Sequence, residues 1–312
     1  MPVDLRGLWV PIITPFTADE SVDADALGRL AGRLLDDGAT GLVVLGTTGE
    51  PATLSGLERR TVVDVCAAVC RDRGRPFIVG AGTNSTRATI DEVATWAAAV
   101  PDAAALLVVV PYYTRPSEAG IVAHYRAVAA ASALPIVAYN IPYRTGRGLG
   151  ADALLDVAAI PGVVGVKQAV GAIDRDMLAV LRDRPAGFEV LAGDDAYIGP
   201  LALMGGSGAI AATAHLRTRE FAAMVAAGLH GDVTTTRRLA ADLLATVDAG
   251  FAEPSPAVFK AALAAHGEIA SPAVRAPMVA ASAEATAAVL ATLAQSARAT
   301  DSSSNTASST AR

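Results

Sequence analysis

The residue with the clearest chemical potential is Lys167, which follows small apolar residues in the stretch VVGVKQAVG, residues 163–171. An ammonium group is costly to bury, so a lysine at such a place usually lies at a strand end with its charge in water. If the amine is instead desolvated, its pKa falls and the neutral form can attack a carbonyl carbon. The stretch alone leaves both interpretations open, and the surrounding elements must decide.

Eight short apolar runs recur along the chain, and each is followed by a segment with helical spacing of its apolar residues, clearest over residues 23–38 and 117–132. The runs are continuously apolar, which is typical of parallel strands buried on both faces. We therefore expect an α/β protein with a closed (β/α)8 TIM barrel, and a doubly wound open sheet is the alternative. The runs cover residues 8–13, 41–45, 76–80, 105–110, 135–139, 163–167, 188–192 and 208–212.

From residue 216 the strand pattern stops, and helical patterns continue over residues 219–232, 234–250, 255–267 and 277–298. We expect a barrel core over residues 1–215, followed over residues 216–297 by the last barrel helix and a C-terminal helical extension. Residues 298–312 lack large apolar side chains that could be buried in a core, and they are expected to form a disordered tail.

In a barrel of this kind, the active site forms where the carboxyl ends of the strands and their following loops meet. Each polar residue at these ends has an ordinary explanation, since threonines cap helices, tyrosines pack with a wet hydroxyl and loop arginines are solvated. Their convergence on one opening nevertheless favours an active site. The residues brought together are Thr47, Thr48, Tyr113, Tyr139, Arg144 and Lys167.

Composition disfavours several other classes of function. The net charge is −6 and basic runs are missing, so neither nucleic acid nor an anionic membrane is an expected partner. Cys66 and Cys70 are the only cysteines and are expected to be buried apolar residues, and the four histidines lack metal-ligand spacing. With no signal-peptide pattern and no long apolar window, we expect a cytoplasmic protein that binds no metal.

Five motifs occur in a specific order, namely GTTGE at 46–50, PYYTRPS at 111–117, YNIPYRTG at 139–146, GVKQAVG at 165–171 and GDD at 193–195. On these motifs, the chain from about Leu8 to Leu293 resembles the dihydrodipicolinate synthase and N-acetylneuraminate lyase superfamily. The resemblance implies a class I aldolase-type barrel enzyme that needs no cofactor. In such an enzyme Lys167 forms a Schiff base with pyruvate or a related 2-oxo acid.

The resemblance also implies roles for the other residues. Tyr139 is expected to shuttle protons, with Thr47 relaying them to Tyr113, whose equivalent in relatives reaches across a dimer interface. We therefore expect a homodimer or a homotetramer. The hydroxyls and backbone amides of Thr47 and Thr48 suit a pyruvate carboxylate. The residues expected to bind substrate are Thr48, Arg144, Gly193 and Ile210.

Arg144 matches the arginine with which the synthases of the family bind the carboxylate of aspartate semialdehyde, and a guanidinium suits that carboxylate. The expected reaction is the synthase reaction of lysine and diaminopimelate biosynthesis, in which pyruvate condenses with L-aspartate-4-semialdehyde. Another pyruvate-dependent aldolase or lyase, acting on a sugar acid or other 2-oxo acid, is the first alternative. A non-catalytic keto-acid-binding barrel is the second.

Some positions depart from the family pattern. Gln168 follows the lysine where many synthases have an acidic residue, and a changed charge there could alter the lysine pKa or the substrate. His215 stands where other members have Asn, and we expect a structural role for it.

The family's lysine-feedback site is matched here by Asn84 and Tyr112 only. Three further positions lack the polar or acidic groups that would hold a lysine ammonium, namely Gly56, Arg59 and Ala88. We therefore expect inhibition by lysine to be weak or absent.

Overall fold

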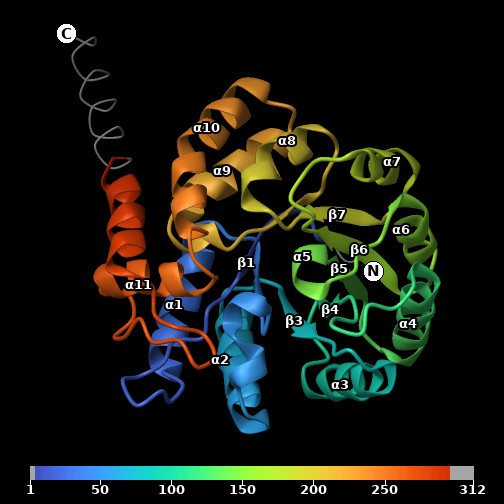
Figure 1. Cartoon of the computed structure of the whole chain (residues 1–312), viewed down its shortest axis with the longest axis horizontal. Helices are drawn as coiled ribbons and strands as arrows, with labels where there is room; N and C mark the ends of the chain where they lie inside the picture. Colours follow the sequence, from blue (N-terminus) through green and yellow to red (C-terminus); the bar gives the residue numbers. More distant parts are fainter. Residues whose placement is uncertain (1–3, 296–312) are drawn as a thin grey trace.

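A closed ring of eight parallel strands forms the centre of the protein, as the computed structural model, which describes residues 4–295, shows (Figure 1). Each strand pairs with the next along the chain, and β8 returns to pair with β1. Each predicted apolar run overlaps one strand, so the TIM barrel is confirmed. The strands are β1 (Gly7–Pro11), β2 (Gly41–Val44), β3 (Phe77–Ala81), β4 (Ala105–Val109), β5 (Ile136–Asn140), β6 (Val163–Gln168), β7 (Glu189–Ala192) and β8 (Gly208–Ile210).

Helices surround the barrel on its outside (Figure 1). Several of them begin at a Ser or Asp whose side chain accepts a hydrogen bond from a backbone N–H of the first turn, as Ser55 does from Glu58. The helices outside the barrel are α1 (Ala24–Asp36), α2 (Gly56–Asp72), α3 (Thr86–Ala99), α4 (Glu118–Ala131), α6 (Ala151–Ala158), α7 (Arg175–Asp183) and α8 (Ile198–Leu203). The short α5 (Pro142–Thr145) lies instead at the carboxyl end of β5, in front of the strands in Figure 1. Short 3₁₀ turns follow three strands, namely η1 (Thr47–Gly49) with η2 (Pro51–Thr53), η3 (Asp195–Tyr197) and η4 (Thr213–His215).

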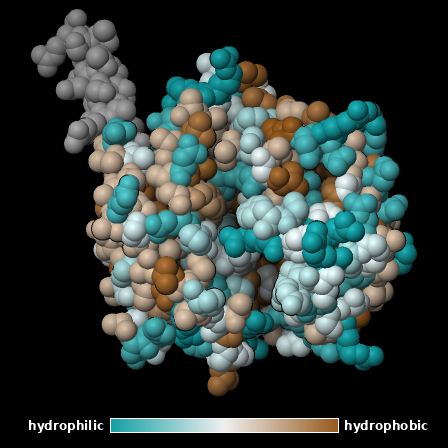
Figure 2. Space-filling model, in the orientation of Figure 1, coloured by the Kyte–Doolittle hydropathy of each residue, from teal (hydrophilic) through white to brown (hydrophobic). Residues whose placement is uncertain are grey.

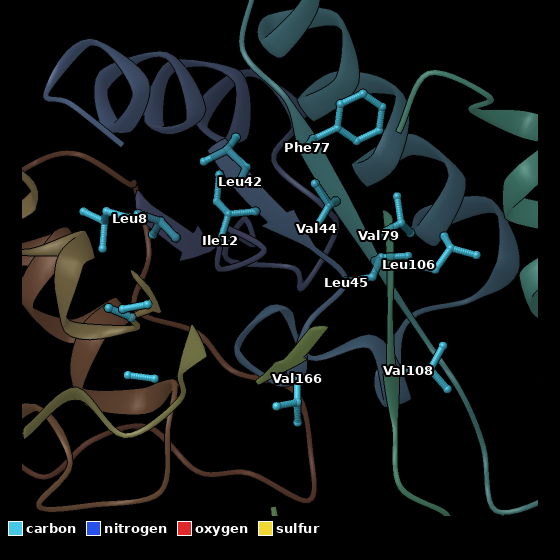
Figure 3. Packing of buried hydrophobic residues seen from close by; sticks show 14 of the residues in the cluster. Leu8, Ile12, Leu42, Val44, Leu45, Phe77, Val79, Leu106, Val108 and Val166 are labelled. Carbon is cyan, nitrogen blue, oxygen red and sulfur yellow. The ribbon is translucent and has the colours of Figure 1, made fainter. Parts of the chain in front are cut away.

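The strands are buried on both faces, as their apolar runs predict. One set of side chains, including Leu42, Val79 and Val166, packs in the layer between strands and helices (Figure 3). A separate cluster, including Tyr139 and Ile210, fills the inside of the barrel. Because successive strand residues point to opposite faces, neighbours along a strand serve different layers.

The chain beyond the barrel is helical. It contains α9 (Thr218–Leu229), α10 (Val233–Gly250) and α11 (Ala257–Ala265), and residues 283–295 are also helical. Because α9 contacts β1 and β8, it closes the helical layer, while α10 packs on α8 and α9. The division between core and extension at residue 216 remains our proposal, and the predicted tail at 298–312 lies outside the described residues. In the part of the chain that is described, no helix is long and apolar enough to cross a membrane.

Candidate active site at the carboxyl ends of the strands

Lys167 lies near the end of β6 and is buried, with 7% of its surface exposed. Strand β6 pairs with β5 in a register that places Lys167 opposite Tyr139, and the Lys167 Nζ lies 4.4 Å from the centre of the tyrosine ring. Burial lowers the pKa of Lys167 to about 8, although the nearby Asp195 carboxylate acts in the opposite direction. The solvated strand-end interpretation is therefore wrong for this lysine, and its amine is desolvated.

Tyr139 connects the lysine to the loop after β2. The ring is buried inside the barrel, and burial raises the pKa of Tyr139, while the charge of Arg144 and a hydrogen bond with Thr47 act to lower it. The phenol is therefore protonated at neutral pH, and its hydroxyl can both donate and accept a hydrogen bond. Thr47 opens η1, and the Thr14 hydroxyl donates to the Gly49 carbonyl at 2.7 Å, which anchors this turn to the loop after β1.

Of the residues predicted to contact the oxo acid, Gly193 lies directly against the lysine. Gly193 follows β7, and a Cβ at this position would lie 2.9 Å from the Lys167 Cε, so only glycine leaves room for the lysine stem. Ile210 ends β8 and belongs to the same interior cluster as Tyr139. Thr48 is buried in η1 beside the exposed Thr47. The structure therefore sets Gly193 against the lysine stem, while the roles of Thr48 and Ile210 in binding the oxo acid remain our proposal.

A cavity of about 420 Å³ lies at this end of the barrel, and its lining includes Thr47, Tyr139 and Arg144. Figure 2 shows a hollow near the centre of the same face, with hydrophilic residues around it. Arg144 lies on α5, directly after β5, and its side chain is exposed with the guanidinium 5.6 Å from the Tyr143 ring. A cation at the rim of an otherwise narrow cavity suits an anionic substrate.

Tyr113 is the one predicted catalytic residue that a single chain leaves apart from the others. It lies in the loop after β4, 85% exposed, with a left-handed backbone φ of 69°. Its backbone N–H donates to the Thr145 carbonyl at 3.3 Å, and among the described residues no hydrogen bond joins its side chain to Thr47. A strained, outward-facing tyrosine is available to a second copy of the chain.

Two acidic residues and one tyrosine beside the lysine were not predicted as site residues. Asp195 is buried, its Oδ2 accepts a hydrogen bond from the Thr213 backbone N–H at 2.6 Å, and burial raises its pKa to about 6. Asp194 Oδ2 accepts from the Gly171 N–H at 2.7 Å. Both carboxylates and Tyr143 act electrostatically to raise the pKa of Lys167. The GDD motif after the seventh apolar run was a usable signal for the two carboxylates.

Gln168 points away from Lys167, because neighbouring strand residues face opposite sides of the barrel wall. Its Oε1 accepts a hydrogen bond from the Asn140 Nδ2 at 2.9 Å, and the Asn140 Oδ1 accepts from the Leu149 N–H at 3.2 Å. The side chain thus ties β5 to β6 in the outer layer.

His215 is also part of the packing. Its Nε2 accepts from the Ile13 N–H at 3.1 Å, its Nδ1 bonds the Ala212 carbonyl at 2.7 Å, and burial lowers its pKa to about 4. The histidine is therefore neutral and fastens the loop after β1 to the loop after β8. Cys66 and Cys70 are buried, with pKa values raised by burial. Among residues 4–295, no group of His, Cys, Asp and Glu side chains could hold a metal ion.

A desolvated lysine paired with a buried tyrosine at the carboxyl ends of the strands defines a (β/α)8 barrel of the lysine-dependent lyase class. The chain belongs to the dihydrodipicolinate synthetase family, whose model matches residues 4–296. It is 43% identical over 279 residues to the 4-hydroxy-tetrahydrodipicolinate synthase of Salinibacter ruber, covering 88% of this chain and 89% of that protein. It is 42% identical to the synthase of the same name from Moorella thermoacetica, covering 88% and 92%.

Solved structures agree with this assignment. The dihydrodipicolinate synthase of Thermotoga maritima matches with a TM-score of 0.90 and 32% identity, covering 94% of this chain and 99% of that one. The chloride-inhibited enzyme of Acinetobacter baumannii, complexed with pyruvate, matches with a TM-score of 0.87 and 32% identity, covering 93% and 98%.

Proposed function

We propose that the protein catalyses the 4-hydroxy-tetrahydrodipicolinate synthase reaction, the condensation of pyruvate with L-aspartate-4-semialdehyde on the route to lysine and diaminopimelate. The observation that carries this proposal is the buried Lys167 amine, which lies 4.4 Å from the Tyr139 ring centre and has a pKa lowered to about 8. The curated relatives at about 40% identity carry the name of this synthase. We also propose that the enzyme works in the cytoplasm and needs no cofactor.

The first half of the reaction depends on the lysine. Its neutral amine attacks the ketone carbon of pyruvate, a carbon–nitrogen bond forms, and the ketone oxygen leaves as water to give an iminium. The iminium withdraws electrons from the neighbouring methyl group, so loss of one methyl proton gives an enamine. Tyr139 is the neutral phenol placed to pass protons in these steps, and its hydrogen bond with Thr47 gives the proton a route out. Thr48, Gly193 and Ile210 surround the bound oxo acid.

The second half joins the two substrates. The enamine carbon attacks the aldehyde carbon of the semialdehyde, and the resulting alkoxide takes up a proton. The amino group of the former semialdehyde then attacks the iminium carbon, which closes the ring, and the carbon–nitrogen bond to Lys167 breaks to release the free amine. Arg144 at the cavity rim binds the carboxylate of this second substrate through its guanidinium. We propose that Tyr113 of a second copy completes the relay to Thr47, so that the working form is a homodimer or homotetramer. One solved relative with a TM-score of 0.89 and 32% identity is a monomeric synthase variant. A monomer of this chain in analytical ultracentrifugation would contradict the proposed role of Tyr113.

The acceptor is tested by steady-state kinetics with pyruvate and a panel of aldehydes. We expect the highest kcat/KM with L-aspartate-4-semialdehyde. Arg144→Ala should raise the KM for that acceptor roughly 10- to 100-fold, the effect of losing a hydrogen-bonded charge pair, with the KM for pyruvate little changed. Arg147→Ala is the matched control, because this nearby arginine is exposed and its guanidinium donates to the Pro116 carbonyl at 2.8 Å. A preference for a sugar aldehyde, unaffected by Arg144→Ala, would overturn the assignment.

A further inference from the structure

A second buried lysine lies outside the site described above. Lys260, on α11, has a fully buried side chain, and its Nζ lies 2.5 Å from the Glu50 Oε1 and 2.8 Å from the Ala273 carbonyl. The Glu50 side chain is itself only 3% exposed. Burying such a pair costs about as much solvation energy as the attraction returns, so stability is a weak reason for its presence. The location of Glu50 suggests a different reason.

Arg275 completes this cluster from the same end of the chain. Its backbone N–H donates to the Glu50 Oε2 at 3.0 Å, so both carboxylate oxygens of Glu50 are held by the C-terminal extension. The Arg275 guanidinium pairs with Glu58 at the start of α2. Both cations lie over the face of the Phe16 ring. The ring centre is 3.9 Å from the Lys260 Nζ and 4.5 Å from the Arg275 guanidinium carbon. The extension is thereby fixed to the loop that follows β2.

Glu50 directly follows the turn that carries Thr47. Its backbone N–H donates to the Thr47 carbonyl at 3.2 Å, and its φ of 55° lies in the left-handed region that residues with a Cβ avoid. A turn that ends on such a residue needs an outside restraint, and the two hydrogen bonds to the Glu50 carboxylate supply it. Ser255, Pro256, Pro277 and Met278 of the extension line the same cavity as Thr47.

We propose that Glu50 is a positioning residue, clamped by Lys260 and Arg275, that holds Thr47 at hydrogen-bonding reach of Tyr139. In this account the C-terminal extension sets the geometry of the proton relay although it contributes no group to the reacting atoms. The inference rests on the proposed function for its catalytic consequence, but its structural part concerns the Thr47 turn alone.

The test compares Lys260→Met with the double variant Glu50→Gln/Lys260→Met. In the double variant both charges are gone, so it should fold even if the single variant leaves the Glu50 carboxylate unpaired and unstable. For both we expect deuterium exchange into the pyruvate methyl group to slow at least tenfold at saturating pyruvate. The yield of the borohydride-trapped pyruvate adduct should stay near that of the wild type, because Lys167 lies on a different element.

The control is Arg217→Met, which also removes a buried cation, one that pairs with Glu220 and Asp242 in the C-terminal helices. We expect a lower Tm with methyl exchange within twofold of the wild type. The inference is overturned if the double variant exchanges the methyl group at the wild-type rate, or if Arg217→Met slows that exchange as much as Lys260→Met does.

Backbone hydrogen exchange separates this inference from the proposed function. Peptides covering residues 46–55 should exchange faster in the double variant than in the wild type, while peptides covering residues 163–171 should not. Unchanged exchange over residues 46–55 would overturn the clamp whatever the enzyme does. If the wild-type protein forms no pyruvate adduct, the proposed function is overturned instead. The hydrogen-exchange result over residues 46–55 would still decide whether the clamp exists.

Discussion

The protein buries two lysines, and their surroundings differ in one respect that decides their chemistry. Burial lowers the pKa of both Lys167 and Lys260 to about 8. Lys260 is held by the Glu50 carboxylate at 2.5 Å, whereas Lys167 has a tyrosine ring as its near neighbour and carboxylates that act on it only through their charge. Because burial is common to both lysines, we propose that freedom from a bonded anion is what leaves Lys167 able to act as the nucleophile.

The largest expected effect concerns the partner of Lys167. Tyr139→Phe removes the hydroxyl that passes protons, so kcat should fall about 10²- to 10⁴-fold, the usual contribution of a general acid or base. Tyr125→Phe is the matched control for lost support, because its buried hydroxyl donates to the Val108 carbonyl at 2.9 Å and accepts from the Tyr139 backbone N–H at 3.4 Å. That variant should lose about 1 kcal/mol of stability and keep its kcat. Equal losses of kcat in the two variants would refute the proton-transfer role.

A smaller effect should appear in the pH dependence of Schiff-base formation. With the pKa of Lys167 at about 8, the neutral fraction, and so the rate with subsaturating pyruvate, rises about tenfold per pH unit below that value and levels off above it. Asp195→Asn removes a negative charge that raises this pKa, so the pKa should fall and the profile should move to lower pH. Asp194→Asn should move it the same way by less. A shift of the pH profile to higher pH in either variant would show that these carboxylates do not raise the pKa of Lys167.

The smallest expected effect is regulatory. Arg59 stands at a position of the family's lysine site, and its guanidinium pairs with Glu92 at 3.0 Å, which leaves that carboxylate less able to hold a lysine ammonium. Millimolar lysine should therefore leave the initial rate nearly unchanged in a dose-response assay. Strong inhibition at this concentration would contradict the prediction. The double variant Arg59→Ala/Ala88→Glu, which frees Glu92 and adds a carboxylate, should become more sensitive to lysine.

The sequence was sufficient to predict the barrel and the proximity of Lys167 and Tyr139 within it. The eight apolar runs have the length and continuity that buried parallel strands require, and the rule that strand ends converge placed Tyr139 and Lys167 at one opening. The rule works because all strands of the barrel run in the same direction, so their carboxyl ends lie at one face whatever the loops contain.

Interactions between distant segments could not be predicted in this way. Glu50 and Lys260 are 210 residues apart, and no periodic pattern links them. The position of Lys260 within the apolar helix AVFKAALAA indicates that the lysine is buried, but no sequence pattern identifies Glu50 as its partner. The outward direction of Gln168 follows from strand alternation, whereas its bond to Asn140 depends on the pairing of β5 with β6. The proposed contact of Tyr113 with a second copy lies beyond what one chain can show.

The most direct test of the comparison between the two lysines is borohydride trapping with pyruvate, followed by peptide mass mapping. We predict one pyruvate adduct per chain, located at Lys167, absent in Lys167→Ala and retained in Lys260→Met. An adduct at Lys260, or none at Lys167 under any condition, would contradict the claim that freedom from a bonded carboxylate selects the nucleophile.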